Sequence, residues 1–160
     1  MKGNNFFHDA FCGVALVPQS VTNTSAVGVT IKEPWTRGRQ IAFLLMGGAQ
    51  AATVDGKMEI QGLQRDDGTT WATLKEYDGS TDLEFTVTLL DDAGDFENGL
   101  VLGTIPLSHV DSETYSAIRV KYTEGGNAAS LICVGYVIYD LFEKPSGMTD
   151  DLFSKCRYAS

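Results

Sequence analysis

Side chains that could carry out chemistry are few in this sequence, and their spacing matches no familiar site. His109 stands close to Asp111 and Ser112, which are the residue types of a hydrolytic triad. A triad is a spatial arrangement, however, so adjacency along the chain is weak evidence for one. Three cysteines lie far apart, in a pattern that fits neither a disulfide framework nor a zinc site: Cys12, Cys133 and Cys156. Nucleophile elbow and phosphate-loop motifs are absent from the sequence. We therefore expect a protein that is not an enzyme and that holds no cofactor and no metal.

Paired acids in two loops are the nearest approach to a metal site. The segment 91–95 resembles a calcium loop only loosely, because it has Ala93 at the third position and Phe96 where glycine is needed. Asp66 and Asp67 could supply carboxylate ligands, but an acidic pair before a glycine is also what a tight hairpin turn uses. We interpret both segments as solvated turns.

The charge of the chain excludes one class of partner. The 160 residues carry a net charge of -9, and residues 51–100 hold twelve acids against three bases. Such a surface repels phosphate backbones, so we expect no nucleic-acid partner. The amino terminus lacks the apolar run of a signal peptide, and no apolar stretch approaches the length of a membrane span. We expect no membrane partner and synthesis in a reducing cytoplasm.

Apolar side chains recur with a period of two along most of the chain, which indicates β-strands with one face toward a core. Three segments alternate in this way: 57–65, 84–90 and 115–122. Two further runs, 41–46 and 131–139, are apolar throughout and predict strands covered on both faces. The sequence predicts an all-β, antiparallel, jelly-roll-like sandwich of about eight or nine strands. In detail, it predicts a strand that Pro18 ends, a bulge at Gly62, and a buried Cys133.

Aromatic and basic residues near the amino terminus are the best candidates for a contact surface. We divide the chain into an arm (1–11), a sandwich domain (12–145) and a carboxy-terminal tail (146–160). The arm either folds back on its own domain or docks on a neighbouring subunit, because its phenylalanines are costly to leave in water. The connector 33–39 is either a contact patch or a cap on the edge of the core, since Trp and Arg are enriched at binding hot spots. The candidate contact residues are Phe6, Phe7, Phe11, Trp35, Arg37 and Arg39.

Two segments, IQGLQRDDGTTW (60–71) and YSAIRVKYT (115–123), carry a resemblance to the jelly-roll decoration, or cement, proteins of tailed bacteriophage capsids. The resemblance implies a virion structural protein that binds the exterior of the capsid and stabilises it, with the major capsid protein as its partner. It also implies a homotrimer. The two runs that are apolar on both faces independently favour self-association.

The same landmarks also resemble discoidin-like carbohydrate-binding sandwiches, which keeps a second function open. Under that alternative the chain is a sugar-binding module of a head fibre or tail-associated adhesin. Trp71 and Trp35 would then present exposed aromatic faces to the sugar.

Overall fold

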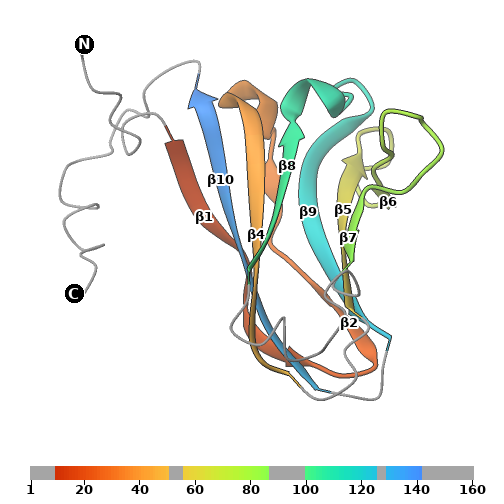
Figure 1. Cartoon of the computed structure of the whole chain (residues 1–160). Helices are drawn as coiled ribbons and strands as arrows, with labels where there is room; N and C mark the ends of the chain where they lie inside the picture. Colours follow the sequence, from red (N-terminus) through yellow and green to blue (C-terminus); the bar gives the residue numbers. More distant parts are fainter. Residues whose placement is uncertain (1–9, 51–55, 87–99, 126–128, 142–160) are drawn as a thin grey trace, which may run out of the picture.

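The computed structural model describes residues 10–50, 56–86, 100–125 and 129–141, and these form two antiparallel sheets packed face to face (Figure 1). The four-stranded sheet has the order β1-β10-β4-β8, and its strands are β1 (Ala10–Val21), β10 (Ser130–Leu141), β4 (Gly38–Gln50) and β8 (Leu100–Pro106). The six-stranded sheet has the order β2-β9-β5-β6, with strands β2 (Thr24–Val27), β9 (Tyr115–Glu124), β5 (Gly56–Gln64) and β6 (Trp71–Thr73). Off this path, β3 (Ile31–Lys32) pairs with β9 and β7 (Glu84–Thr86) pairs with β5.

The order of the strands confirms the predicted jelly-roll-like sandwich. The chain crosses between the sheets at six of the nine connections between described strands. It stays in the six-stranded sheet from β2 to β3, at the hairpin where β5 leads into β6, and from β6 to β7. The described residues contain ten strands because two strands are broken: β2 and β3 share β9 as partner, and β6 and β7 share β5. Counted as continuous units, they give the eight strands of a double Greek key.

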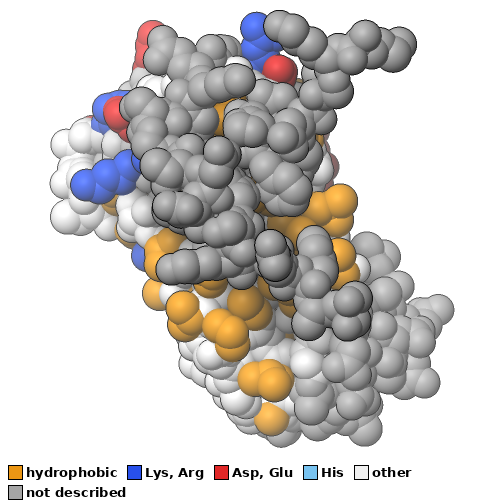
Figure 2. All heavy atoms as spheres, turned by 90° about the vertical axis from the view of Figure 1, so that its left-hand side faces the viewer, with side chains coloured by type: hydrophobic (Ala, Val, Ile, Leu, Met, Phe, Trp, Pro, Cys, Tyr) orange, Lys and Arg blue, Asp and Glu red, His pale blue; other side chains and the backbone are white. Residues whose placement is uncertain are grey.

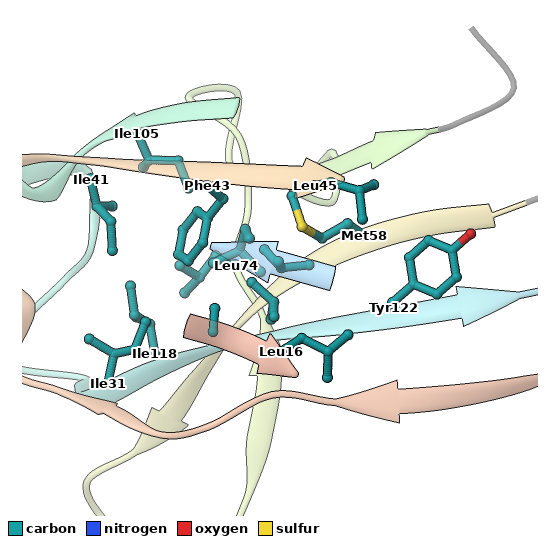
Figure 3. Close-up of a cluster of buried hydrophobic side chains, with 14 of the residues drawn as sticks. Leu16, Ile31, Ile41, Phe43, Leu45, Met58, Leu74, Ile105, Ile118 and Tyr122 are labelled. Atoms are coloured by element: carbon teal, nitrogen blue, oxygen red, sulfur yellow. The ribbon is translucent and has the colours of Figure 1, made fainter. Parts of the chain in front are cut away.

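The core lies between the two sheets and consists of the inward side chains of both (Figure 3). Ile41, Phe43 and Leu45 of β4 face Met58 of β5 and Ile118 of β9 across the core. All of these side chains are fully buried, in the alternating pattern that the sequence predicted. The alternation thus fixes which side of each strand faces the other sheet.

Three predicted details are wrong, each for a local reason. β1 continues through Pro18 to Val21, because a register shift between Leu16 and Gln19 lets the proline lie in an edge strand. Gly62 itself pairs regularly with Ala72 and Ile118, and the register shift of β5 lies one residue further on, between Leu63 and Gln64. The missing side chain of Gly62 makes room for the Tyr115 ring. Cys133 points to the outer side of β10 and is half-buried.

The outer faces of the two sheets differ in chemistry. On the six-stranded sheet, Lys57 forms ion pairs with Glu59 (3.3 Å) and Glu84 (2.9 Å), and Lys121 forms one with Glu59 (3.3 Å). The outer face of the four-stranded sheet carries apolar side chains. Figure 2 views the molecule from the side of β1: hydrophobic side chains run down the described surface, and the visible charged ones lie toward its upper end.

One end of the sandwich gathers the short helices and several of the described loops (Figure 1). The 3₁₀ helix η2 (Pro34–Thr36) precedes β4, and η4 (Leu107–His109) follows β8. The chain also enters β1 and leaves β10 at this end. Among the residues that the structure describes, no helix is long and apolar enough to span a membrane.

Candidate functional site: a protein-contact surface

Phe11, Tyr136 and Arg37 form an aromatic and cationic cluster where the chain enters the four-stranded sheet. Phe11 belongs to β1, and its ring centroid lies 6.1 Å from that of Tyr136 on β10. The guanidinium carbon of Arg37 lies 4.8 Å from the Phe11 centroid, which is cation–π geometry. Gly13 makes the arrangement possible, because a Cβ at that position would lie 2.5 Å from the Tyr136 ring. The cluster therefore depends on a glycine two residues beyond Phe11.

The position of Arg37 follows from the local structure of the connector. Pro34 opens η2, and Glu33 before it adopts a left-handed conformation with φ of 41°. The carbonyl of Glu33 accepts hydrogen bonds from the backbone N–H of Thr36 (3.0 Å) and from its hydroxyl (2.8 Å). The Glu33 carboxylate accepts a bond of 2.9 Å from Arg65, whose Nε also donates to the carbonyl of Ser112. Glu33 is thus tied to two further loops, and this holds η2 in place.

Trp35 and Arg39 line an open depression of ≈ 480 Å³ between η2 and η4. The remaining lining comes from the start of β4 and from the segment after β8: Gly38, Gln40, Leu107, Ser108, Val110 and Ser112. Trp35 is half-buried and packs against the core, so it caps the core edge and also presents part of its ring to the depression. The structure therefore supports the core-cap alternative for Trp35, and its role in a contact patch stays a prediction.

Both candidate arginines are exposed, and Arg39 forms an ion pair at the surface. It lies 3.9 Å from the carboxylate of Asp140, and both side chains are more than half exposed. Exposed ion pairs of this kind contribute little to stability, about 0–1 kcal/mol. The guanidinium can therefore exchange this contact for a carboxylate on a partner at small cost.

Trp71 lies on a different surface from Trp35. It belongs to β6 of the six-stranded sheet, and the guanidinium carbon of Arg119 lies 4.1 Å from its ring centroid. Arg119 is itself fixed by a hydrogen bond of 2.9 Å from its Nε to Gln61. One face of the Trp71 ring is therefore occupied within the chain, and the two tryptophans form no common platform.

Three aspartates lie in the loops at the end of the sandwich that holds η2 and η4, and each aspartate closes its own turn by hydrogen bonds. Asp67 accepts backbone hydrogen bonds of 2.8 Å from Thr69 and Thr70 and a further bond from the Thr70 hydroxyl. Asp78 bonds to Ser80 and Thr81 in the same way, and Asp111 bonds to Glu113 and Thr114. Hydrogen bonds lower the pKa of Asp67 to about 2. The largest effect comes from the Thr70 hydroxyl, followed by the backbone N–H groups of Thr70 and Thr69. The hydroxyl and backbone donors of their turns lower the pKa of Asp78 and Asp111 as well.

The turn at Asp67 accounts for one of the two acidic segments that the sequence raised as possible ligand sources. The carboxylate oxygens of Asp67 bind the turn itself, as the hairpin interpretation requires. No group of three or more potential metal ligands occurs within the described parts of the chain. The loop 91–95 lies outside them.

His109 takes no part in a triad and instead supports an exposed tyrosine. Its Nε2 lies 2.5 Å from the carbonyl oxygen of Lys75, so this nitrogen is the donor. Its ring centroid lies 4.2 Å from that of Tyr77, whose side chain is 77% exposed. Sequence reasoning missed Tyr77, because nothing in an Asp-Gly loop indicates which way its aromatic side chain points.

Of the predicted contact residues, the structure brings Phe11 and Arg37 into contact and places Trp35 and Arg39 on the adjacent depression. Phe11 lies in β1, so the described sandwich already begins within the predicted arm. Phe6 and Phe7 lie outside the described residues. We call Phe11, Trp35, Arg37, Arg39 and Tyr136 together the rim surface.

Comparisons with known proteins bear on the fold. The sequence matches no protein-family model and no curated protein. Among solved structures, the chain is similar to the PBSX exported protein XepA, at 12% identity and a TM-score of 0.50. The match covers 87% of this chain but only 40% of that of XepA. This similarity shows the fold alone.

Two virus structures are more distant matches. Infectious bursal disease virus, Gx strain, matches over 88% of this chain and 34% of its own, with 10% identity and a TM-score of 0.44. Desmodium yellow mottle tymovirus matches over 86% of this chain and 91% of its own, with 9% identity and a TM-score of 0.40.

Proposed function

We propose that this protein is a non-enzymatic virion structural protein that binds the exterior of a phage capsid and stabilises it. The observation that supports the proposal most directly is the rim surface, where Arg37 covers Phe11 beside the Trp35–Arg39 depression. Aromatic side chains and arginines in this arrangement are typical of binding hot spots. The partner would be the major capsid protein, as the resemblance to decoration proteins implies.

The charge distribution supports a protein partner with acidic groups at the contact. The chain carries a net charge of -9, yet the rim surface contributes two arginines. Carboxylates of a coat subunit could pair with Arg37 and Arg39 through charge-assisted hydrogen bonds. The segment 1–9, with Phe6 and Phe7, joins the chain directly before β1 and would extend the same contact.

Binding to undecorated shells tests the proposal. The full chain should co-sediment with the shells and raise the temperature at which they disrupt, because a ligand of the assembled state stabilises it by mass action. Deletion of residues 2–9, or the pair Arg37→Ala and Arg39→Ala, should leave the circular dichroism spectrum unchanged and weaken binding at least about tenfold.

Lys75→Ala is the matched control. Lys75 is also a partly exposed cation at the loop end of the sandwich, but its side chain pairs with Asp82, and neither residue lines the Trp35–Arg39 depression. This variant should bind shells like the full chain. If the arginine variants also bind like the full chain, the contact lies elsewhere and the rim surface is only a cap on the core.

A carbohydrate-binding function remains the alternative, and one observation favours it. Tyr77 presents an exposed ring at the loop end, where His109 braces it from one side. Binding to a glycan array that Tyr77→Ala abolishes, with or without Trp71→Ala and Trp35→Ala, would support an adhesion module over a capsid protein. A folded protein that binds no glycan would argue against this alternative.

A further inference from the structure

The outer face of the four-stranded sheet is a continuous apolar surface. The strand registers place its residues in three rows that run across the sheet. Within these rows, Leu102 is 61% exposed and Val14 is 51% exposed. The rows are Cys12, Val137, Ala42 and Thr104; then Val14, Gly135, Leu44 and Leu102; then Cys133, Met46 and Leu100. None of these positions is charged, and we call this surface the apolar sheet face.

The outer face of the six-stranded sheet differs from the apolar sheet face, because its outward side chains are mainly charged. The corresponding outward positions on β5 and β9 hold Lys57, Glu59, Arg119 and Lys121, which form ion pairs or hydrogen bonds with their neighbours. A solvated sheet alternates apolar inward residues with polar outward ones. The six-stranded sheet follows that rule, whereas the four-stranded sheet departs from it: of the eleven outward positions in the three rows, only Thr104 has a polar side chain and none is charged.

We propose that the apolar sheet face packs against the same face of a second copy of this chain, related by a twofold axis. The overall charge argues for this face, because two chains of net charge -9 repel each other unless they meet where neither carries charge. A heterologous contact would need a second, complementary apolar surface. The outer face of the six-stranded sheet is charged and offers none. The contact is therefore isologous, and the pair is a dimer in place of the trimer expected from the sequence.

The size of the face fits the core of such an interface. Four strands spaced about 4.8 Å apart, with three outward rows about 7 Å apart, give a flat area of roughly 400 Å². Side-chain relief increases the accessible area, and a standard interface buries about 800 Å² on each partner. The face therefore supplies the apolar centre, while polar residues around it supply the rest. Two sheets stacked in this way would lie about 10 Å apart with their strands crossed by about 30°.

Sedimentation equilibrium of the full chain and two variants tests this interface without any capsid. The unmodified protein should be a dimer at tens of micromolar. Leu102→Glu places a carboxylate on the face, and the twofold axis places it there twice, so the dissociation constant should rise at least about 100-fold. Met46→Glu, on β4, should act in the same direction. The far-ultraviolet circular dichroism spectra should remain those of the unmodified protein, because both side chains are at least 40% exposed.

Val27→Glu is the matched control, because Val27 is 53% exposed on β2 at the edge of the other sheet, and the change adds the same charge. It should leave the dimer intact. A monomer at all concentrations, a trimer, or a dimer that Leu102→Glu does not weaken would each overturn the proposal. The test is also independent of capsid binding, because a chain that fails to bind shells can still form the dimer.

Discussion

Replacing Gly13 by alanine tests how the rim surface is built. The added Cβ would lie 2.5 Å from Cε1 and 2.7 Å from the hydroxyl oxygen of Tyr136, whereas ordinary contact is about 3.5–4 Å. The Tyr136 ring must therefore move by about 1 Å or more. Overpacking of this kind costs about 1–3 kcal/mol. Alanine recovers about 0.5–1 kcal/mol of the backbone entropy that glycine loses on folding, so we expect a net loss of about 1–2 kcal/mol.

Gly135 provides a control that differs in the space around it within one chain; because it lies on the apolar sheet face, both variants are compared at concentrations where the chain is a monomer. It lies on β10 beside Tyr136, and the atoms nearest to a Cβ there are 3.8 Å away or more. Gly135→Ala should therefore be neutral or stabilising by up to about 1 kcal/mol. Urea denaturation of the two variants gives the comparison directly. Equal destabilisation by both would show that loss of glycine, and not the Tyr136 ring, determines the cost.

A double-mutant cycle with Tyr136→Leu completes the test. In the absence of the ring, Gly13→Ala should no longer be destabilising, which corresponds to a coupling energy of about 2 kcal/mol between the two positions. Additive effects would refute the proposed contact. If the rim surface binds a capsid, Gly13→Ala alone should also weaken shell binding, because it moves Tyr136 relative to Phe11 without removing either arginine.

Two further predictions concern the stability of the sandwich. The folded-state pKa of Asp67 is lowered to about 2, so its contribution is present above the ordinary value of 3.8 and is lost as the pH falls toward 2. The urea midpoint of the unmodified protein should therefore fall as the pH is lowered from 3.8 toward 2, and the midpoint of Asp67→Asn should fall less. A midpoint that does not change with pH would contradict the role of the turn. Tyr122→Phe should cost about 1–3 kcal/mol, because the hydroxyl bonds to buried Glu124 and Ser130. Tyr77→Phe, on an exposed ring, should leave the urea midpoint nearly unchanged, and equal effects would show that the buried bonds contribute little.

The sequence predicts the sandwich well because side-chain alternation is a local property of each strand. Met58 and Ile60 point inward as expected, and the apolar runs 41–46 and 131–139 become the adjacent strands β4 and β10. The breaks within strands were not predictable in the same way. Pro18 and Gly62 have clear local preferences, but edge position and cross-strand packing decide their final geometry.

The candidate site was predictable in composition but not in geometry. Phe11, Arg37 and Trp35 stand out as residue types, yet their grouping depends on strand pairing between residues more than one hundred positions apart, such as Phe11 and Ile138. Likewise, the apolar run 131–139 does not show how far Cys133 is buried, because this depends on residues from other strands. Tyr77 was missed for the same reason, since the ring that packs against it belongs to His109 in a distant loop.

The apolar sheet face and the rim surface are coupled through β1 and β10, which contribute residues to both. A dimer carries two rim surfaces, so a shell with a regular array of sites could engage both at once. Binding of the second would then be intramolecular, and the apparent affinity would exceed that of one surface by about 10²–10⁴-fold if the spacing allows it. Leu102→Glu, which touches no rim residue, should therefore weaken shell binding as it dissociates the dimer. A monomeric Leu102→Glu variant that binds shells as tightly as the unmodified protein would show that each chain binds alone, so that pairing serves another purpose.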